Sequence, residues 1–455
     1  MALPTVLLEA ISAATGGKVV LILGAGCSVD APTNLPLSKA CSIEAHRRLL
    51  RDNVLQEGEC QNPEDLSLLA DAVWKKTGSQ EELVNRLPKQ AFRLARPNEG
   101  YLLAAALLRE QALLAVLTLN FDLAASHALM TVGGHEVEIL EGPEYIAGLT
   151  NLIYLHRNAN SPGNDWILRT EALEDHWKGK WEELITQRVM AASVSVFVGL
   201  GSPAGVLTAS VQRIRKSNVT SSAYVVGRGT AAQSPFLALL GLNAESYIQS
   251  TWADFMEELS ARVMEEHRAK LESACTQLAN TNGWHVEDVI DICKRIAGLG
   301  ILGVGFLRAT WFLEKESYLP FKGVDVQQWA DLVLVLALIE RTTGLRATFS
   351  DGLLEFTSDN RRVAIIAFVS GRGTKRWLAI ESELQKQGRE WLRHGRVPTI
   401  AIVTSAIMPT KQMSAPPNLV TDYEEGDIVG AVSNIRMVNA YELRDNPNLI
   451  NNVVS

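Results

Sequence analysis

Short apolar runs, each ending in a glycine or polar turn, recur over roughly the first 260 of the 455 residues, and they constrain the fold more than any other feature. Continuous apolar runs of this length, separated by stretches of helical pattern, are typical of buried parallel strands that carry helices on both faces. The sequence therefore predicts an α/β domain with a Rossmann-like parallel sheet. The runs are Lys18–Leu23, Leu114–Leu119, Leu152–Leu155, Val194–Leu200 and Ala223–Val226.

The segments between and after these runs are mostly helical in pattern. We predict helices over Ser38–Arg51 and over most of residues 52–113, which would form an insertion or cap. From about Ser250 to Ser317, apolar residues recur at helical spacing, as in a helical bridge.

The order of predicted elements changes in the last third of the chain, which marks another domain. We predict three parts: an α/β domain over residues 1–255, a helical bridge over 256–320 and a smaller α/β domain over 321–455. The elements expected in the last part are a helix over Val326–Glu340, strands near Ala347–Phe356 and Arg362–Val369, a helix over Lys375–Arg393 and a strand over Thr399–Thr404.

Charge and the N-terminal sequence exclude several classes of protein. The net charge of −8 gives no overall attraction to nucleic acid or to an anionic membrane, although a local basic patch stays open. The N-terminus has no basic region ahead of an apolar core, and the apolar run Ile296–Leu307 is too short to span a bilayer. We therefore expect a cytoplasmic protein with no membrane partner.

The five cysteines form no C-x-x-C pair and are widely scattered. This spacing favours neither a zinc site nor a disulfide framework. We expect reduced structural thiols and no metal.

The first candidate motif is Gly24-Ala25-Gly26-Cys27-Ser28, directly after the first apolar run. Glycines at such a turn let the backbone bend tightly and approach a pyrophosphate, while the N-terminus of the next helix supplies N–H donors and a favourable dipole. The same turn also occurs in α/β proteins that bind no nucleotide. Because Val29-Asp30-Ala31 follows, the third glycine of a dehydrogenase is missing, which disfavours that class.

Two further motifs place polar residues after strands. Asn120 and Asp122 follow the second run, in Thr118-Leu119-Asn120-Phe121-Asp122, and His156 follows the third. Ligands of open α/β sheets bind outside the carboxyl ends of parallel strands, so these side chains are expected near the glycine turn. The alternatives are that Asp122 only caps the next helix and that His156 is a packed histidine.

The fourth motif is Gly199-Leu200-Gly201-Ser202-Pro203, after the fourth run, and Gly227 and Arg228 follow the last run. An ordinary strand-to-helix turn would have the same composition. The significance of these residues therefore depends on their order in the chain.

That order, with each motif after an apolar run, resembles the sirtuin superfamily, and within it the bacterial branch that hydrolyses NAD. The resemblance covers about residues 15–250. It implies that Asn120 orients the attacking water or the ribose, that Asp122 lies near the nicotinamide amide and that His156 is the general base. It further implies NAD phosphates at Gly24, Ala25, Gly26 and Ser28, a nicotinamide-side loop ending at Pro36, adenosine ribose beside Gly201 and Ser202, and adenine near Gly227 and Arg228.

Three departures from the sirtuin pattern bear on activity. Arg157-Asn158 follows the histidine where sirtuins usually have glycine, which alters the loop that would fit a peptide. The segment Pro32-Thr33-Asn34-Leu35-Pro36 replaces the usual glycine-proline loop. No cysteine pairs supply the zinc ribbon of deacylase sirtuins, so hydrolysis ranks ahead of deacylation.

The resemblance thus implies an NAD hydrolase that forms nicotinamide and ADP-ribose. A histidine, with an ordinary pKa of about 6.5, can accept a proton from a water or a ribose hydroxyl near neutrality. Members of this branch commonly act as antiphage effectors that deplete NAD when triggered, and the resemblance implies that role here. The alternatives are a catalytically silent NAD- or ADP-ribose-binding regulatory module and, ranked last, an NAD-dependent protein deacylase; cyclisation of ADP-ribose also stays open.

The C-terminal domain resembles the restriction-endonuclease-like core in the order of its elements only. The strand that would carry E-x-K reads VAIIAFV, so the nuclease chemistry is missing. The basic residues around its predicted strands indicate either a solvated charged face or a nucleic-acid contact. They are Arg361, Arg362, Arg372, Lys375 and Arg376. We expect this domain to sense a trigger, bind a partner protein or form a homo-oligomer.

Overall fold

The computed structural model describes most of the chain, in two compact units. The units are Met1–Val263 and Met264–Ser455, and the division falls within one long helix, α12 (Trp252–Thr281). The described residues are 3–12, 18–134, 137–141, 150–177, 192–201, 203–217, 221–281, 283, 285–311, 326–350, 353–358, 361–376, 400–407 and 436–446.

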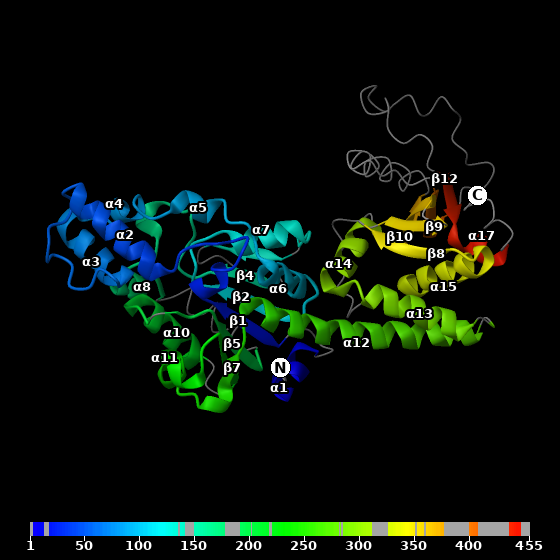
Figure 1. The fold of residues 1–455 in the computed structure, drawn as a ribbon, viewed down its shortest axis with the longest axis horizontal. Coiled ribbons are helices and arrows are strands. Elements are labelled where there is room, and N and C mark those ends of the chain that lie inside the picture. Colours follow the sequence, from blue (N-terminus) through cyan, green and yellow to red (C-terminus); the bar gives the residue numbers. More distant parts are fainter. Residues whose placement is uncertain are drawn as a thin grey trace, which may run out of the picture. The chain divides into compact units, whose positions relative to one another are not determined.

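A parallel sheet forms the centre of the first unit (Figure 1). Over the described residues it has seven strands in the order β3-β4-β2-β1-β5-β6-β7, and all neighbouring pairs are parallel. The strands are β1 (Val19–Leu23), β2 (Leu113–Thr118), β3 (Glu138–Leu140), β4 (Asn151–Tyr154), β5 (Val194–Val198), β6 (Ser222–Gly227) and β7 (Tyr247–Gln249). The predicted Rossmann-like α/β fold is confirmed.

Each predicted apolar run forms a strand, and most of the strand residues are buried because helices cover both faces of the sheet. All five residues of β1 and all five of β5 are buried. The edge strands β3 and β7 have three residues each and include exposed positions, Ile139 in β3 and Gln249 in β7. Such short, half-exposed edges carry no continuous apolar run, and the sequence did not predict them.

Helices flank the sheet and extend beyond it. The predicted helix over Ser38–Arg51 is confirmed as α2, and the helical pattern over residues 52–113 is confirmed as four helices. Helices α2, α3 and α4 pack against one another. The helices of this unit are α1 (Thr5–Ile11), α2 (Ser38–Arg51), α3 (Leu66–Thr77), α4 (Glu81–Val84), α5 (Lys89–Arg93), α6 (Glu99–Arg109), α7 (Ala124–Thr131), α8 (Thr170–Trp177), α10 (Gly205–Ser217) and α11 (Pro235–Leu239).

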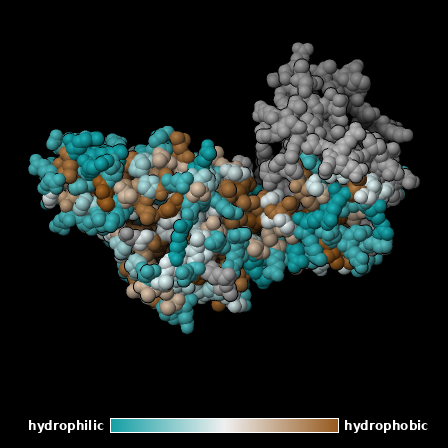
Figure 2. All heavy atoms as spheres, in the orientation of Figure 1, coloured by the Kyte–Doolittle hydropathy of each residue, from teal (hydrophilic) through white to brown (hydrophobic). Residues whose placement is uncertain are grey.

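Hydrophilic side chains cover much of the surface seen over α2 and α3 in Figure 2. Helix α3 buries Leu66, Leu69, Ala70 and Val73 and exposes its two lysines, which is the one-sided burial of an amphipathic helix. Over the described residues, the structure contains no helix with the length and apolarity needed to cross a membrane.

The central strands of the sheet end in register, which determines where the polar motifs lie. Leu23 of β1 pairs with Thr118 of β2 on one side and with Val198 of β5 on the other, and Thr118 pairs with Tyr154 of β4. The chain leaves β1 towards β2 and later returns to the opposite side of β1 as β5. This reversal is the topological switch point at which open α/β sheets form a crevice.

The second unit contains a mixed sheet and helices. Its five described strands have the order β12-β11-β10-β9-β8; β9 is antiparallel to both of its neighbours, β8 and β10, whereas β10, β11 and β12 are parallel. Its elements are α13 (Val286–Ala297), α14 (Gly300–Trp311), α15 (Val326–Thr343), β8 (Arg346–Ser350), β9 (Leu353–Ser358), β10 (Arg361–Arg376), β11 (Ile400–Ile407), β12 (Arg436–Asn439) and α17 (Ala440–Asp445).

Two expectations for this unit need correction. The segment near Ala347–Phe356 forms a hairpin of two strands, β8 and β9. The helix predicted to begin at Lys375 is wrong at its start, because Lys375 and Arg376 pair with Ala406 and Ile407 of β11 and so extend β10. Strand pairing here overrides a weak local helical pattern. The rest of that predicted helix lies outside the described residues.

The five basic residues singled out in the sequence all lie on one strand, β10. The structure therefore places them along a single strand of the mixed sheet. Their contact with nucleic acid stays a prediction.

Candidate functional site

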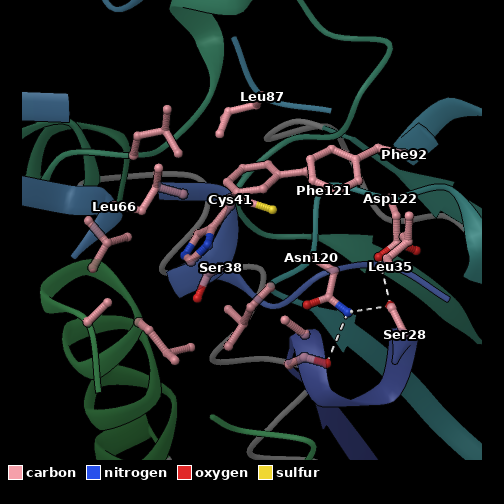
Figure 3. A pocket seen from close by; sticks show the side chains of 18 of the residues that line it. Ser28, Leu35, Ser38, Cys41, Leu66, Leu87, Phe92, Asn120, Phe121 and Asp122 are labelled. Carbon is pink, nitrogen blue, oxygen red and sulfur yellow. Dashed lines mark hydrogen bonds between the residues drawn. The ribbon is translucent and has the colours of Figure 1, made fainter. Parts of the chain in front are cut away.

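A pocket that is open to solvent lies at the carboxyl ends of β1, β2 and β4 (Figure 3). Its walls combine many apolar side chains with a few convergent polar groups, as in small-molecule sites. Phe92 and Phe121 line one part of the wall and Leu66 another. The predicted site residues that line the pocket are Gly24, Ala25, Ser28, Pro36, Asn120, Asp122 and His156.

Asn120 is held in one orientation by the glycine turn. Its side-chain nitrogen Nδ2 donates to the backbone oxygen of Gly24 at 3.0 Å. Because a carbonyl oxygen can only accept, the amide nitrogen must face Gly24. The other atom of the amide, Oδ1, then points away from Ser28 into the pocket (Figure 3), where it can accept a hydrogen bond.

A chain of buried hydroxyls connects Asn120 to Asp122. Asn120 Nδ2 lies 3.1 Å from the hydroxyl of Tyr101, that hydroxyl lies 2.8 Å from Ser28 Oγ, and Ser28 Oγ donates to Asp122 Oδ2 at 2.8 Å. A carboxylate only accepts, so Ser28 donates to Asp122 and accepts from Tyr101, whose oxygen accepts from Asn120. All four residues are buried, so the network fixes the polar end of the pocket.

Asp122 serves the fold and the pocket together. Its Oδ1 accepts from the backbone N–H of Ala124, the first residue of α7, at 3.0 Å. The N-cap of α7 is Leu123, so Asp122 supports the start of the helix from one residue before the cap position. Its other oxygen joins the hydroxyl network. Burial raises the pKa of Asp122, and the hydrogen bonds from Ser28 and the backbone counter part of that rise.

His156 is buried, lines the pocket and bonds to a helix across it. Its Nε2 lies 2.8 Å from Ser210 Oγ of α10. This contact fixes the ring at one nitrogen and so aligns the plane of the imidazole.

Arg157, after the histidine, occupies the conformation expected of a glycine. Its φ is +70°, in the left-handed region that L-residues avoid, and its Nη1 donates to the backbone oxygen of Glu141 at 2.6 Å. The turn after β4 therefore has a backbone conformation that favours glycine, although arginine occupies it.

The two glycine turns pack directly on each other. Gly26 N–H donates to Gly199 O at 2.8 Å, and a Cβ added to Gly24 or Gly26 would lie 2.7 Å from that oxygen. Gly199 itself has φ +66° and leaves no room for a Cβ against Cys27. Close packing of the two turns therefore accounts for Gly24, Gly26 and Gly199 without a ligand, and Gly26 does not line the pocket.

The remaining predicted residues lie elsewhere. A Cβ on Gly201 would meet nothing within 4 Å, whereas one on Gly227 would lie 2.6 Å from the hydroxyl of Tyr247. Arg228 forms an ion pair with Asp30 and is more than half exposed. None of these three lines the pocket, and Ser202 lies outside the described residues.

Three helices begin at the pocket, and their first turns differ. Asp65 caps α3 through Oδ1, and its Oδ2 accepts from the N–H of Gly205 at the start of α10 at 3.4 Å. Helix α2 begins at Ser38 with no side-chain cap. The turn at Ala25–Ser28 is a short 3-10 helix, and α2, the helix predicted to follow the glycine turn, begins ten residues after Ser28.

Sequence reasoning missed two residues of the site, Tyr101 and Ser210. Both lie within helices, α6 and α10, where a tyrosine or a serine in a helical pattern carries no functional signal. Only the fold brings them against Asn120 and His156. Over the described residues, no group of three or more His, Cys, Asp or Glu side chains is placed to hold a metal ion.

The fold and the pocket define a parallel α/β protein with a polar site at the switch point of its sheet. No protein-family model and no curated protein matches the chain. Similar solved structures include a Sir2 homologue in complex with NAD (16% identity, TM-score 0.36, covering 59% of this chain and 95% of that one). Others are a mutant Sir2 homologue with 2′-O-acetyl ADP-ribose (17%, 0.35, 58% and 97%) and Sir2 bound to an acetylated peptide (16%, 0.31, 57% and 96%). The identities and TM-scores are low, and the fold assignment rests on the sheet topology.

Proposed function

We propose that the first unit binds NAD in this pocket and hydrolyses it to nicotinamide and ADP-ribose. The observation that carries the proposal is the fixed amide of Asn120, whose oxygen faces a pocket that His156 also lines. An oriented acceptor and a histidine on one pocket are the groups needed to position a water and remove its proton.

The pocket has features suited to a dinucleotide. The residues that line it in the described structure include no lysine or arginine, so a pyrophosphate would depend on backbone N–H groups and helix dipoles. The first turn of α2 and Ala25, the first residue of the 3-10 helix, offer such N–H groups, since the first N–H groups of a helix lack partners within it.

The proposed reaction needs little chemistry from the protein. The bond between the nicotinamide nitrogen and C1′ of the ribose breaks, its electron pair neutralises the pyridinium ring, and a water adds to C1′. His156 accepts the proton of that water, which then passes to solvent, and Asn120 Oδ1 orients the water or a ribose hydroxyl. The buried carboxyl group of Asp122, when ionised, favours the cationic ring and the oxocarbenium-like transition state.

The experiment is incubation of the purified full-length protein with NAD, followed by chromatographic measurement of nicotinamide and ADP-ribose. We expect both products in equal amounts from the wild type, and at least a hundredfold less from Asn120→Ala and His156→Ala. Ser195→Ala, in β5 and away from the pocket, is the matched control and is expected to retain activity. Wild-type activity that both site variants retain would refute the assignment.

The alternatives give different results in the same assay. A silent binding module would bind NAD by calorimetry and leave it intact. A deacylase would release nicotinamide only with an acyl-lysine peptide present, and a cyclase would give cyclic ADP-ribose. Hydrolysis is favoured because the sequence has no cysteine pairs of the kind that hold the zinc ribbon of deacylase sirtuins.

We further propose that this is a regulated antiphage effector of the cytoplasm. The support is the ordered set of motifs shared with that branch of the sirtuin superfamily. In this proposal residues 1–255 cleave NAD, residues 256–320 form a bridge, and residues 321–455 sense the trigger through a partner protein, a homo-oligomer or nucleic acid. Mass-spectrometric measurement of NAD in phage-challenged cells tests it: NAD should fall with the wild type and stay constant with His156→Ala.

A further inference from the structure

We propose that Tyr101 is the positioning residue that holds Asn120 in its reactive orientation, acting through its hydroxyl and supported from behind by Trp252. This inference rests on the proposed function, since it assigns a role within the same site. It concerns a side chain that does not line the pocket and that no sequence motif marks.

The hydroxyl of Tyr101 lies where the hydrogen-bond network branches. It lies 3.1 Å from Asn120 Nδ2 and 2.8 Å from Ser28 Oγ, whereas the direct contact between Asn120 and Ser28 is longer, at 3.4 Å. Asn120 Nδ2 has two hydrogens, and Gly24 O takes one. The Tyr101 oxygen is therefore the better acceptor for the second, and together the two bonds fix the amide plane.

The ring of Tyr101 is itself immobilised. Tyr101 is 2% exposed, and its ring contacts that of Trp252 edge-on, with 5.9 Å between centroids. Trp252 also lies against the preceding residue of α6, because a Cβ on Gly100 would lie 2.3 Å from its Nε1. A hydroxyl on a ring held in this way is placed with little freedom, as expected for a group that positions another.

Tyr101 also keeps its proton. Burial, and then the charge of Asp122, raises the pKa of its hydroxyl well above the ordinary value. The group is thus a neutral donor to Ser28.

The test compares Tyr101→Phe with a matched control, Tyr154→Phe. The first variant keeps the ring against Trp252 and removes only the hydroxyl. The control removes another buried tyrosine hydroxyl in the same unit, which lies 2.8 Å from Ser126 Oγ and does not contact Asn120. NAD turnover, KM for NAD and the thermal midpoint are measured for both variants and the wild type.

We expect the kcat of Tyr101→Phe to fall about tenfold to a hundredfold, because a small misplacement of a reactive group has an effect of that size. KM should stay within about twofold, and the thermal midpoint should shift no more than in Tyr154→Phe, whose kcat stays at the wild-type value. If Tyr101→Phe does not fold, Trp252→Phe is the second variant. It weakens the packing of the Tyr101 ring and leaves every hydrogen-bond partner of Asn120 in place. It should also lower kcat while KM stays constant.

The possible failures are separable. If the wild type hydrolyses NAD and Tyr101→Phe matches Tyr154→Phe in kcat, the positioning role is refuted and the proposed function stands. The same conclusion follows if kcat falls only in proportion to the folded fraction. If the wild type does not hydrolyse NAD, the proposed function fails and this inference fails with it.

Discussion

The backbone N–H of Gly26 donates to the carbonyl oxygen of Gly199 at 2.8 Å, which joins the turn after β1 to the turn after β5. These turns belong to strands that are neighbours in the sheet but are 175 residues apart in the chain, from Gly24 to Gly199. The contact explains why glycine stands at these positions independently of any ligand. Gly201 differs from these glycines: a Cβ there would meet nothing within 4 Å, so close packing does not require glycine at that position.

We therefore predict that alanine affects the stability of the protein at one glycine of the second turn, Gly199, and not at the other, Gly201. Gly199→Ala places a Cβ 2.6 Å from the backbone nitrogen of Cys27 at a φ of +66°, and it should destabilise the protein by about 2–4 kcal/mol. Gly201→Ala meets nothing within 4 Å and should leave stability within about 0.5 kcal/mol. Urea unfolding of both variants measures these differences.

The same pair tests the role that the resemblance assigns to Gly201. If the adenosine ribose lies beside it, Gly201→Ala should raise the KM for NAD severalfold while the unfolding curve stays unchanged. An unchanged KM would remove Gly201 from the binding site.

The sequence predicted the central strands because their burial on both faces imposes a continuous apolar run, as in β1 and β5. It also predicted which residues would gather at one end of the sheet, since parallel strands deliver their carboxyl ends to a common edge. Asn120, Asp122 and His156 line one pocket for that reason.

The parts that were missed depend on contacts between distant segments. The helical pattern around Tyr101 predicts only that its ring is buried. Its hydroxyl reaches Asn120 because α6 packs against β2 in the folded protein. Ser210 is one polar residue among several in α10. The local pattern at Lys375 predicts a helix, because the pairing of Lys375 with Ala406 depends on a distant segment and leaves no local sequence signature.

Ser210→Ala should lower activity through His156. Without the hydroxyl, Nε2 of the buried histidine loses its hydrogen bond to Ser210 and the ring is less well oriented, so we expect kcat to fall about tenfold with KM little changed. The loss of the bond should also destabilise the fold by about 1–2 kcal/mol.

Ser195→Ala serves as the control for Ser210→Ala. Ser195 is likewise a buried serine of the first unit, but its Oγ has no hydrogen-bond partner. Its removal should leave kcat unchanged and stability equal or slightly higher. Equal kinetic effects of the two alanine variants would show that Ser210 does not act on the histidine.

Asp122 should make stability depend on pH in a defined direction. Its pKa is raised in the folded state by burial, so the folded protein binds this proton more tightly than the unfolded chain. The associated stabilisation is fully present below the ordinary carboxyl pKa of about 3.9 and is lost as the pH rises through the raised value. Asp122→Asn does not titrate, so its stability relative to the wild type should increase from acid to neutral pH.

Asp52 provides a control of opposite sign. Hydrogen bonds from Arg51 lower its pKa at the surface, so Asp52→Asn should lose stability relative to the wild type as the pH rises. Urea unfolding at a series of pH values measures both differences. A flat or falling difference for Asp122→Asn would show that its carboxyl group is not destabilised by burial.

Arg157 offers a direct measure of backbone strain beside the histidine. Its φ of +70° is unfavourable for any residue with a Cβ, by about 1–2 kcal/mol. Arg157→Gly and Arg157→Ala both lose the hydrogen bond to Glu141 O, so the difference in stability between them isolates the effect of the backbone. The glycine variant should be more stable by about 1 kcal/mol.

The same two substitutions at Arg47, which is exposed in the middle of α2, serve as the control. There the alanine variant should be the more stable one, since glycine weakens a helix by about 1 kcal/mol relative to alanine. If alanine is also the better residue at 157, the turn after the histidine strand is not strained.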